Sequence, residues 1–229
     1  MNDLTIFGIE TSGKTASVSI LKENCVLYSE TVFTTLTHSQ TLIPMCERAI
    51  KSAGISFSDI DRIAVSEGPG SYTGLRIGIA AVKGMCLKGD IFTCGVSTLK
   101  AMAYNLLPFE GIILCVMKAR ENIAYFGIYR SDGEKIETVY DDSVSKIHDI
   151  KDAIDGLNGK TVVVGDWAEF IKKELFADDE KIILAPTDKL LQDAKGVCLA
   201  ALAENKFYPA SDLNAKYLQI TKAEKDRLK

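Results

Sequence analysis

The order of the predicted strands and helices is the sequence feature that most restricts the fold. The first half predicts three successive strands, then three helices that alternate with two further strands. The strands are expected at 4–9, 17–21, 26–33, 62–66 and 92–96, and the helices at 39–53, 74–87 and 97–106. The second half repeats this order, with strands at 112–117, 123–129, 135–140, 161–164 and 181–185 and helices at 144–157, 167–176 and 190–207.

This repeated order predicts an α/β fold of two duplicated ribonuclease H-like lobes, each a mixed sheet with helices on its faces. We expect a first lobe at 1–106 and a second, more divergent lobe at 107–229, with a C-terminal segment that packs back on the first. The plan is similar to that of the actin, hexokinase and heat-shock ATPase (ASKHA) superfamily, in which nucleotide lies between the lobes. A likeness of fold does not establish function.

Residues 66–78, SEGPGSYTGLRIG, place four glycines and a proline between a predicted strand and a predicted helix. The first two glycines permit backbone conformations closed to other residues, and the proline fixes its own φ, so this half predicts a tight strand-to-helix turn. Gly74 and Gly78 continue into the helix, where each costs about 1 kcal/mol relative to alanine. We expect close packing against another subunit to offset this cost.

Residues 8–15, GIETSGKT, match the phosphate-binding P-loop pattern G-x-x-x-x-G-K-[ST] letter for letter. A working P-loop lies between a strand and a helix whose N-terminus faces the phosphates. Here residues 16–22 alternate like a strand, and Glu10 would repel phosphate. We therefore favour a tight hairpin with Gly13 at its turn. A third interpretation places this hairpin where the superfamily wraps a nucleotide phosphate.

The helices predicted at 39–53 and at 74–87, the second with Thr73 as candidate N-cap, are apolar around much of their circumference. A helix that is apolar on every side is buried on every side. We interpret the two helices as half of a four-helix interface with a second subunit; the alternative is that packing within the chain covers them. The expected partner-binding positions are Leu42, Met45, Cys46, Ala49, Gly74, Gly78, Val82 and Met85.

Composition narrows the possible functions. The chain has 27 Lys and Arg against 31 Asp and Glu, a net charge of −4, which argues against a surface that grips nucleic acid throughout. No apolar run approaches the ~18 residues of a membrane span, and the N-terminus lacks a signal-peptide pattern, so we expect a cytoplasmic protein. The six cysteines form no C-x-x-C pair, and the two histidines, His38 and His148, lie far apart, so no metal site is expected.

Several motifs make the chain similar to the Gcp/Kae family. Besides SEGPGSYTGLRIG, the residues IETS at 9–12 resemble the family's opening hairpin, and HSQTLIP at 38–44 is similar to its H-S-x-x-L-x-P start of the first helix. GVSTLKAMA at 95–103 resembles G-V-S-S-L-x-A-x-A, and KAR at 118–120, followed by Tyr125, resembles D-A-R-x-x-x-x-Y. The second lobe matches weakly beyond these motifs.

The resemblance implies a place in the bacterial machinery that installs threonylcarbamoyl on tRNA adenosine (t6A). It implies the catalytic paralogue TsaD and the ATPase TsaE as partners, a homodimer in isolation, and contact with tRNA through the complex. In TsaD a histidine pair spaced H-x-x-x-H holds the metal, and Thr98 and Met102 stand at the matching positions here. The acidic residue usual before A-R is Lys118, which argues against ATP hydrolysis in the cleft.

The leading hypothesis is a non-catalytic dimerisation and activating subunit without a cofactor of its own, any nucleotide being bound only at the level of the complex. The alternative is a nucleotide-hydrolysing enzyme or phosphotransferase of the superfamily, whose turnover would be lost in Lys14→Ala. A peptidase has less support because no serine has a histidine at a suggestive spacing. A degenerate nucleotide cleft would comprise Glu10, Thr11, Ser12, Lys118 and Arg120, and the family-motif loop comprises Gly68, Pro69, Gly70, Ser71, Thr73 and Arg76.

Overall fold

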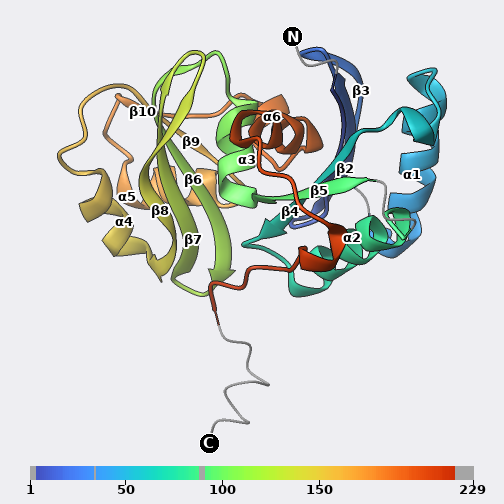
Figure 1. The fold of residues 1–229 in the computed structure, drawn as a ribbon. Helices are drawn as coiled ribbons and strands as arrows, with labels where there is room; N and C mark the ends of the chain where they lie inside the picture. The colour runs from blue at the N-terminus through green and yellow to red at the C-terminus, as the bar shows by residue number, and fades with distance from the viewer. Residues whose placement is uncertain (1–3, 34, 88–90, 220–229) are drawn as a thin grey trace, which may run out of the picture.

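Two mixed sheets form the framework of the molecule (Figure 1). The computed structural model describes residues 4–33, 35–87 and 91–219, and within these ranges each sheet has five strands. The first sheet runs in the order β3 (Cys25–Phe33), β2 (Thr15–Lys22), β1 (Thr5–Glu10), β4 (Arg62–Gly68), β5 (Phe92–Ser97). The second runs β10 (Ile182–Leu184), β9 (Thr161–Val164), β6 (Glu110–Arg120), β7 (Ile123–Asp132), β8 (Ile136–Lys146).

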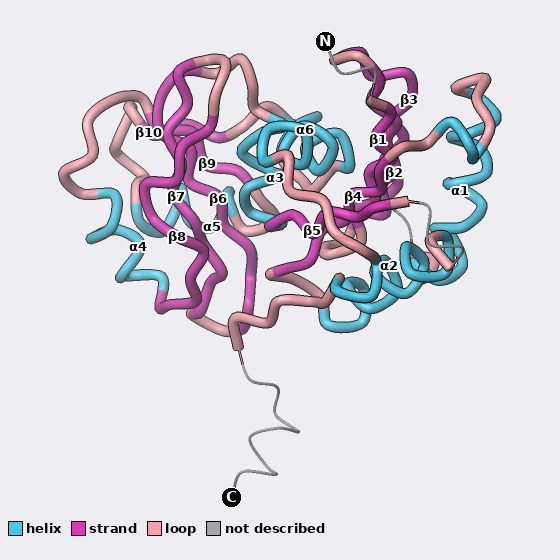
Figure 2. Tube along the Cα trace, in the orientation of Figure 1, coloured by secondary structure: helices cyan, strands magenta, loops and turns pink. Residues whose placement is uncertain are grey.

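The helices occupy three layers around these sheets (Figures 1 and 2). Two helices cover the outer face of each sheet, and two lie between the sheets. They are α1 (His38–Ser52) and α2 (Tyr72–Met85) on the first sheet, α4 (Ile147–Ile154) and α5 (Ala168–Leu175) on the second, and α3 (Thr98–Asn105) and α6 (Ala194–Glu204) in the middle. The two sheets share one topology, so the predicted two-lobe α/β plan is confirmed.

Alternating side chains on the central strands build these layers. In β1, Ile6 faces the layer between the lobes while Phe7 faces α1 and α2, and both are fully buried. In β6, Ile113 faces the middle layer while Ile112 faces α4 and α5. Successive residues of a strand point to opposite faces, so a strand buried on both sides is apolar at every position. This explains the uninterrupted apolar runs of the sequence.

Three predicted boundaries are corrected. The helix expected at 144–157 begins only at Ile147, because residues 144–146 continue β8 and pair with β7. The helix expected at 190–207 begins at Ala194, where the Asp193 side chain caps it by accepting a hydrogen bond from the Lys195 amide. Helix α2 is capped by Ser71, whose Oγ accepts from the Gly74 amide at 3.2 Å, and not by Thr73.

The segment after α6 returns to the first lobe. Tyr208 exchanges two backbone hydrogen bonds with Thr93 on β5, at 2.7 and 2.9 Å. Further along, Leu213 is fully buried in the apolar cluster beneath α1 and α2. Residues 208–213 thus pack back on the first lobe. Within the ranges that the structure describes, no helix is both long enough and apolar enough to cross a membrane.

Candidate functional site

The match to the P-loop pattern is a hairpin. Strands β1 and β2 pair antiparallel up to Glu10 and Ser17, and no helix begins behind the turn. A side chain at Gly13 would collide with Gln192, since its Cβ would lie 2.4 Å from the Gln192 Oε1. The favoured hairpin interpretation is therefore confirmed, and the P-loop is ruled out by the missing helix N-terminus.

The carboxylate of Glu10 is fully buried at the end of β1. One of its oxygens accepts a hydrogen bond from the Ser12 amide, while Oε2 has no partner among the described residues. The hydroxyls of Ser12 and Ser66 are buried and likewise lack partners there. Burial raises the pKa of Glu10 to about 6, although the hydrogen bond from the Ser12 amide acts in the opposite direction. This environment does not favour a bound phosphate.

The family-motif loop packs directly on this hairpin. The Ser71 amide donates to the Ser12 carbonyl at 2.7 Å, and a Cβ at Gly70 would lie 2.4 Å from that same oxygen. Gly68 adopts φ +128°, which favours glycine, and a Cβ there would lie 2.2 Å from the Lys216 carbonyl oxygen. The tight turn expected from the sequence is confirmed, and the structure adds that the chain's own C-terminal segment lies against it.

The glycines inside α2 also face this hairpin. A Cβ at Gly74 would lie 2.1 Å from the Thr11 carbonyl oxygen, and one at Gly78 would lie 2.4 Å from the Thr11 Oγ1. The Thr11 hydroxyl donates to the Gly74 carbonyl at 2.8 Å. The prediction that another subunit explains these two glycines is wrong, because the close approach is made by Thr11 in the hairpin turn after β1 of the same chain.

The other predicted partner-binding residues also face inward. Five of them have at most 3% of their surface exposed, and Met85 is half-buried in the same cluster. The five are Leu42, Met45, Cys46, Ala49 and Val82. They form the stripe that packs α1 and α2 onto the first sheet, so these side chains are core and do not contact a partner directly. The alternative of packing within the chain accounts for this side of both helices.

A second side of α1 and α2 points to solvent, and we call it the outer face. It contains the exposed Ile43 and Pro44 of α1 and a stripe of small or apolar residues along α2. The stripe recurs at helical spacing and comprises Thr73, Ile77, Ala80 and Gly84. No described atom lies within 4 Å of a Cβ built on Gly84. Some of the exposed apolar residues of the first lobe thus lie on this face, and Ile77 also packs against the core.

The residues expected on the second-lobe side of the cleft lie at the end of β6. The Lys118 amide donates to Asp166 at 3.1 Å, and the Lys118 ammonium lies 5.6 Å from the centre of the Trp167 ring. Burial raises the pKa of Asp166, and the charges of Lys14 and Lys118 oppose this shift. Because Lys14 belongs to the first-lobe hairpin, the hairpin faces the second lobe here. Arg120 donates two hydrogen bonds to Gln219, at 2.6 and 3.1 Å.

Neither Thr98 nor Met102 forms a metal site. Both are buried in α3, and the Thr98 hydroxyl has no partner within the part of the chain that is described. In those same residues no three His, Cys, Asp or Glu side chains are grouped to hold a metal. His38 has a packing role, because its Nε2 donates to the Gly13 carbonyl at 3.0 Å and fastens α1 to the hairpin.

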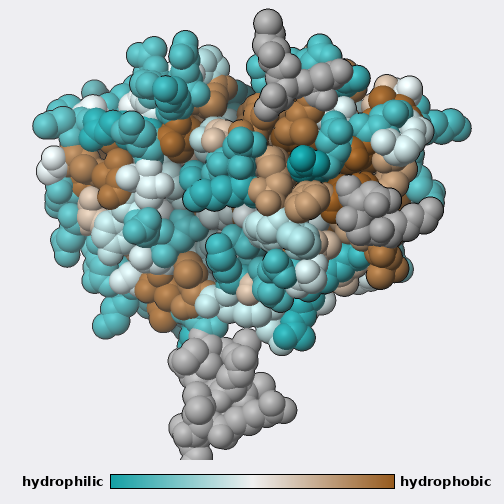
Figure 3. Space-filling model, in the orientation of Figure 1, coloured by the Kyte–Doolittle hydropathy of each residue, from teal (hydrophilic) through white to brown (hydrophobic). Residues whose placement is uncertain are grey.

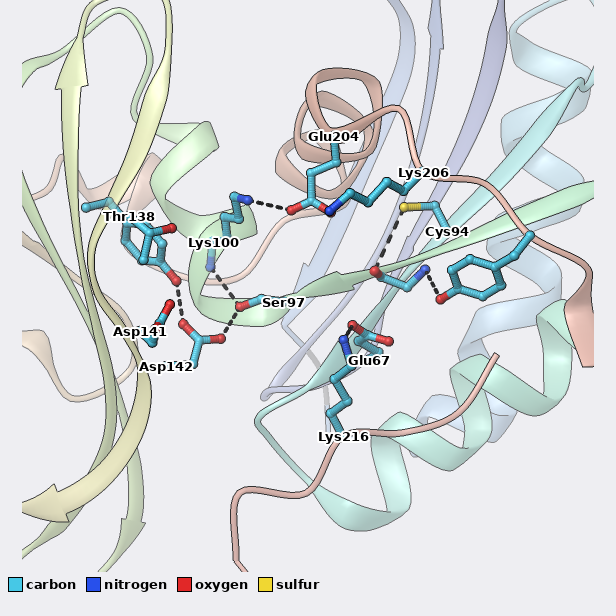
Figure 4. A pocket seen from close by; sticks show the side chains of 13 residues that line it. Glu67, Cys94, Ser97, Lys100, Thr138, Asp141, Asp142, Glu204, Lys206 and Lys216 are labelled. Atoms are coloured by element: carbon cyan, nitrogen blue, oxygen red, sulfur yellow. Dashed lines mark hydrogen bonds and ion pairs between the residues drawn. The ribbon is translucent and has the colours of Figure 1, made fainter. Parts of the chain in front are cut away.

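A polar cavity between the lobes was missed by the sequence analysis. It measures about 410 Å³ and is bordered by β5, α3, β7, β8 and the C-terminal segment (Figure 4). Asp142 accepts hydrogen bonds from the Ser97 and Tyr129 hydroxyls and so joins β8 to the start of α3. Hydrophilic residues border the hollow between the lobes (Figure 3). The only sequence signal was Glu67 within the family motif, because the other groups come from distant segments.

Comparison with known proteins identifies the relatives of this chain. A family model described as TsaD, tRNA N6-adenosine threonylcarbamoyltransferase, matches residues 33–195. The Buchnera aphidicola protein named tRNA threonylcarbamoyladenosine biosynthesis protein TsaB is 31% identical over 198 residues, covering 82% of this chain and 91% of that protein. The Escherichia coli protein of the same name is 27% identical and covers 94% of this chain and 95% of its own length.

Solved structures agree on the architecture. A Pseudomonas aeruginosa crystal structure, described as an uncharacterized protein with similarity to peptidase YEAZ, has a TM-score of 0.81 at 24% identity and covers 94% of this chain and all (100%) of its own. The activator of 2-hydroxyisocaproyl-CoA dehydratase from Clostridium difficile, with bound ADPNP, has a TM-score of 0.53 at 14% identity, covering 88% of this chain and 95% of its own. At these identities the likeness shows the fold alone.

The duplicated lobes and their shared strand order define the fold class of this chain as ASKHA-like. Within that class, the matched model spans most of the chain, and the Buchnera relative exceeds 30% identity over most of both proteins. The chain belongs to the family of TsaD and TsaB proteins of tRNA threonylcarbamoyladenosine biosynthesis.

Proposed function

We propose that this chain is a non-catalytic, activating subunit of threonylcarbamoyladenosine formation on tRNA. The observation that carries the proposal is a likeness to proteins named TsaB along nearly the whole chain, combined with Thr98 and Met102 at the positions of the metal-binding histidines of TsaD. Imidazole is a common metal ligand, whereas a threonine hydroxyl and a thioether are poor ligands for hard cations. The chain then contributes through its partners and needs no cofactor of its own.

The outer face of α1 and α2 is the proposed docking surface for TsaD, and for a second copy of the chain when TsaD is absent. It is exposed and largely apolar. At Gly84 no described residue occupies the space that a Cβ would take. Small residues along a helix allow another helix to approach closely. TsaE and tRNA would join through the assembled complex and not through this chain alone. A nucleotide-hydrolysing enzyme is not favoured, because the hairpin lacks the helix of a P-loop.

A charged side chain in this face tests the proposal. Ala80→Arg adds a charge at an exposed position of α2, so the chain should fold normally but bind purified TsaD at least about tenfold more weakly, because an arginine buried at the interface has no partner. Ala177→Arg, at an exposed position of the second lobe, is the matched control. Binding is measured by titration calorimetry, and modified adenosine by mass spectrometry of tRNA.

Two results would count against the proposal, and they are separable. Equal TsaD affinities of Ala80→Arg and Ala177→Arg would reject the docking surface alone. An unchanged rate of tRNA modification by TsaD and TsaE when this chain is omitted would reject the activating role itself.

A further inference from the structure

The C-terminal residues 214–219, which we call the strap, cross the edge of the interlobe cavity. Upstream, the chain is firmly anchored, because Tyr208 pairs with β5 and Leu213 is fully buried in the first-lobe core. Beyond Leu213 the strap runs past the family-motif loop and reaches the second lobe at Arg120. Its Lys216 is part of the cavity wall (Figure 4).

Two latches hold the strap. On the first lobe, the Lys216 amide donates to the Glu67 carbonyl and its ammonium pairs with the Glu67 carboxylate, both at 2.6 Å. On the second lobe, Gln219 accepts the two hydrogen bonds from Arg120. Between the latches, Tyr217 lies against the Tyr72 ring with the centroids 5.1 Å apart. Residues 214–219 are therefore held to both lobes.

Apart from Ala215, which packs against the first-lobe core, and the ring contact of Tyr217, these contacts are polar and mostly solvent-exposed. The Lys216 side chain is 73% exposed, whereas the Glu67 side chain is only 7% exposed. Exposed ion pairs and single hydrogen bonds contribute little stability, and segments held only by such contacts open more easily than the core. The buried Leu213 and the partly buried Ala215, which both pack in the first-lobe core cluster, fix the base of the strap.

The strap borders the cavity on the side where Glu67 lies. Burial raises the pKa of the Glu67 carboxyl, and Lys216 opposes this shift. Elsewhere on its wall, Cys94 lines the same cavity with 1% of its surface exposed. On the far wall, Lys100 pairs with Glu204 at 2.6 Å, so that pair does not depend on the strap. Only the Glu67 side of the cavity changes when the strap leaves.

We propose that the strap is a releasable lid on the interlobe cavity, which pivots at Leu213 and is latched to the first lobe by Lys216 and Glu67 and to the second lobe by Gln219 and Arg120. Its release opens the cavity at Glu67 and uncovers the family-motif loop. The inference rests on contacts within this chain and stands whether or not the outer face docks TsaD.

Alkylation of the cysteines in the full chain tests the lid. Each thiol is followed by peptide mass spectrometry after timed exposure to iodoacetamide. Lys216→Met should speed modification of Cys94 roughly tenfold, since it removes a charge-assisted bond and leaves a buried carboxylate unpaired, and Gln219→Ala should speed it by a few fold. Cys46 and Cys198 are buried away from the cavity and serve as internal standards.

Two controls keep the test decisive. Lys206→Met removes another lysine of the cavity wall that has no ion pair within the described residues, and it should leave the Cys94 rate unchanged. In Glu67→Gln combined with Lys216→Met, no buried charge is left, so the acceleration should be smaller than in Lys216→Met alone. Equal Cys94 rates in the wild type, Lys216→Met and Gln219→Ala would overturn the lid. Parallel acceleration at Cys46 and Cys198 would also overturn it, because the chain would then be unfolding as a whole.

Discussion

The inner and outer sides of α2 carry glycines for different reasons. On the inner side, Gly74 and Gly78 have Thr11 of the same chain where a Cβ would be. On the outer side, Gly84 has no described atom within 4 Å of that point. A glycine within a helix lowers stability in both cases, but only the inner pair is compensated by packing within the chain. The comparison teaches that glycines in one helix must be interpreted one by one, by what lies beside them.

The largest expected change in stability comes from comparing substitutions on the inner and outer sides of the neighbouring helix α1. Leu42→Ala removes a side chain that is 1% exposed and should lower the free energy of unfolding by about 3 kcal/mol through lost burial and a cavity. Ile43→Ala, at the next residue but 45% exposed, should lower it by less than about 0.5 kcal/mol. Urea denaturation measures both. Similar losses would mean that the inner and outer sides are wrongly assigned.

The next effect concerns the inner glycines. Gly74→Ala places a methyl group 2.1 Å from the Thr11 carbonyl oxygen, so the helix or the hairpin must shift. We expect a loss of about 2 kcal/mol, measured as a lower urea midpoint with an unchanged slope. If Gly74→Ala were as stable as the wild type, the close approach of α2 to Thr11 would not exist in solution.

The hairpin beneath these glycines predicts a dependence on pH. The pKa of Glu10 is about 6 when folded, above its ordinary value of 4.5, so between these values the folded state binds more protons than the unfolded state. Its contribution to stability is therefore lost as pH rises from about 4.5 through about 6, by up to roughly 2 kcal/mol. Glu10→Gln should flatten this part of the curve of unfolding free energy against pH. A curve that kept its wild-type shape would show that Glu10 is ionised without penalty.

The smallest expected change in stability concerns Gly84, on the outer side of α2. Gly84→Ala meets no described neighbour and should raise the free energy of unfolding by up to about 1 kcal/mol. If the outer face docks TsaD closely at Gly84, the same variant should bind TsaD more weakly although it is more stable. Thermal unfolding measures the stability of the variant, and calorimetric titration measures its affinity for TsaD. A more stable variant with unchanged affinity would remove Gly84 from the proposed surface.

Much of the framework follows from the sequence. Strand β9 begins and ends at the predicted residues, and the hairpin at Gly13 and the turn at Gly68 occur where glycine and alternating apolar residues require them. Local signals decided these features, because strand periodicity and glycine conformation depend on neighbours in the chain. The boundaries at 144–147 and 190–194 failed because strand pairing and the Asp193 cap override helical spacing.

The sequence by itself predicted two duplicated lobes and a hairpin in place of a P-loop, and the structure confirms both. Only the tertiary structure decided which side of α1 and α2 is core, that Thr11 is the neighbour of Gly74 and Gly78, and that Lys216 closes on Glu67. Hydrophobicity along a helix shows how much of it is buried but does not name what buries it. The residues that cover a helix are decided by contacts between segments far apart in the chain.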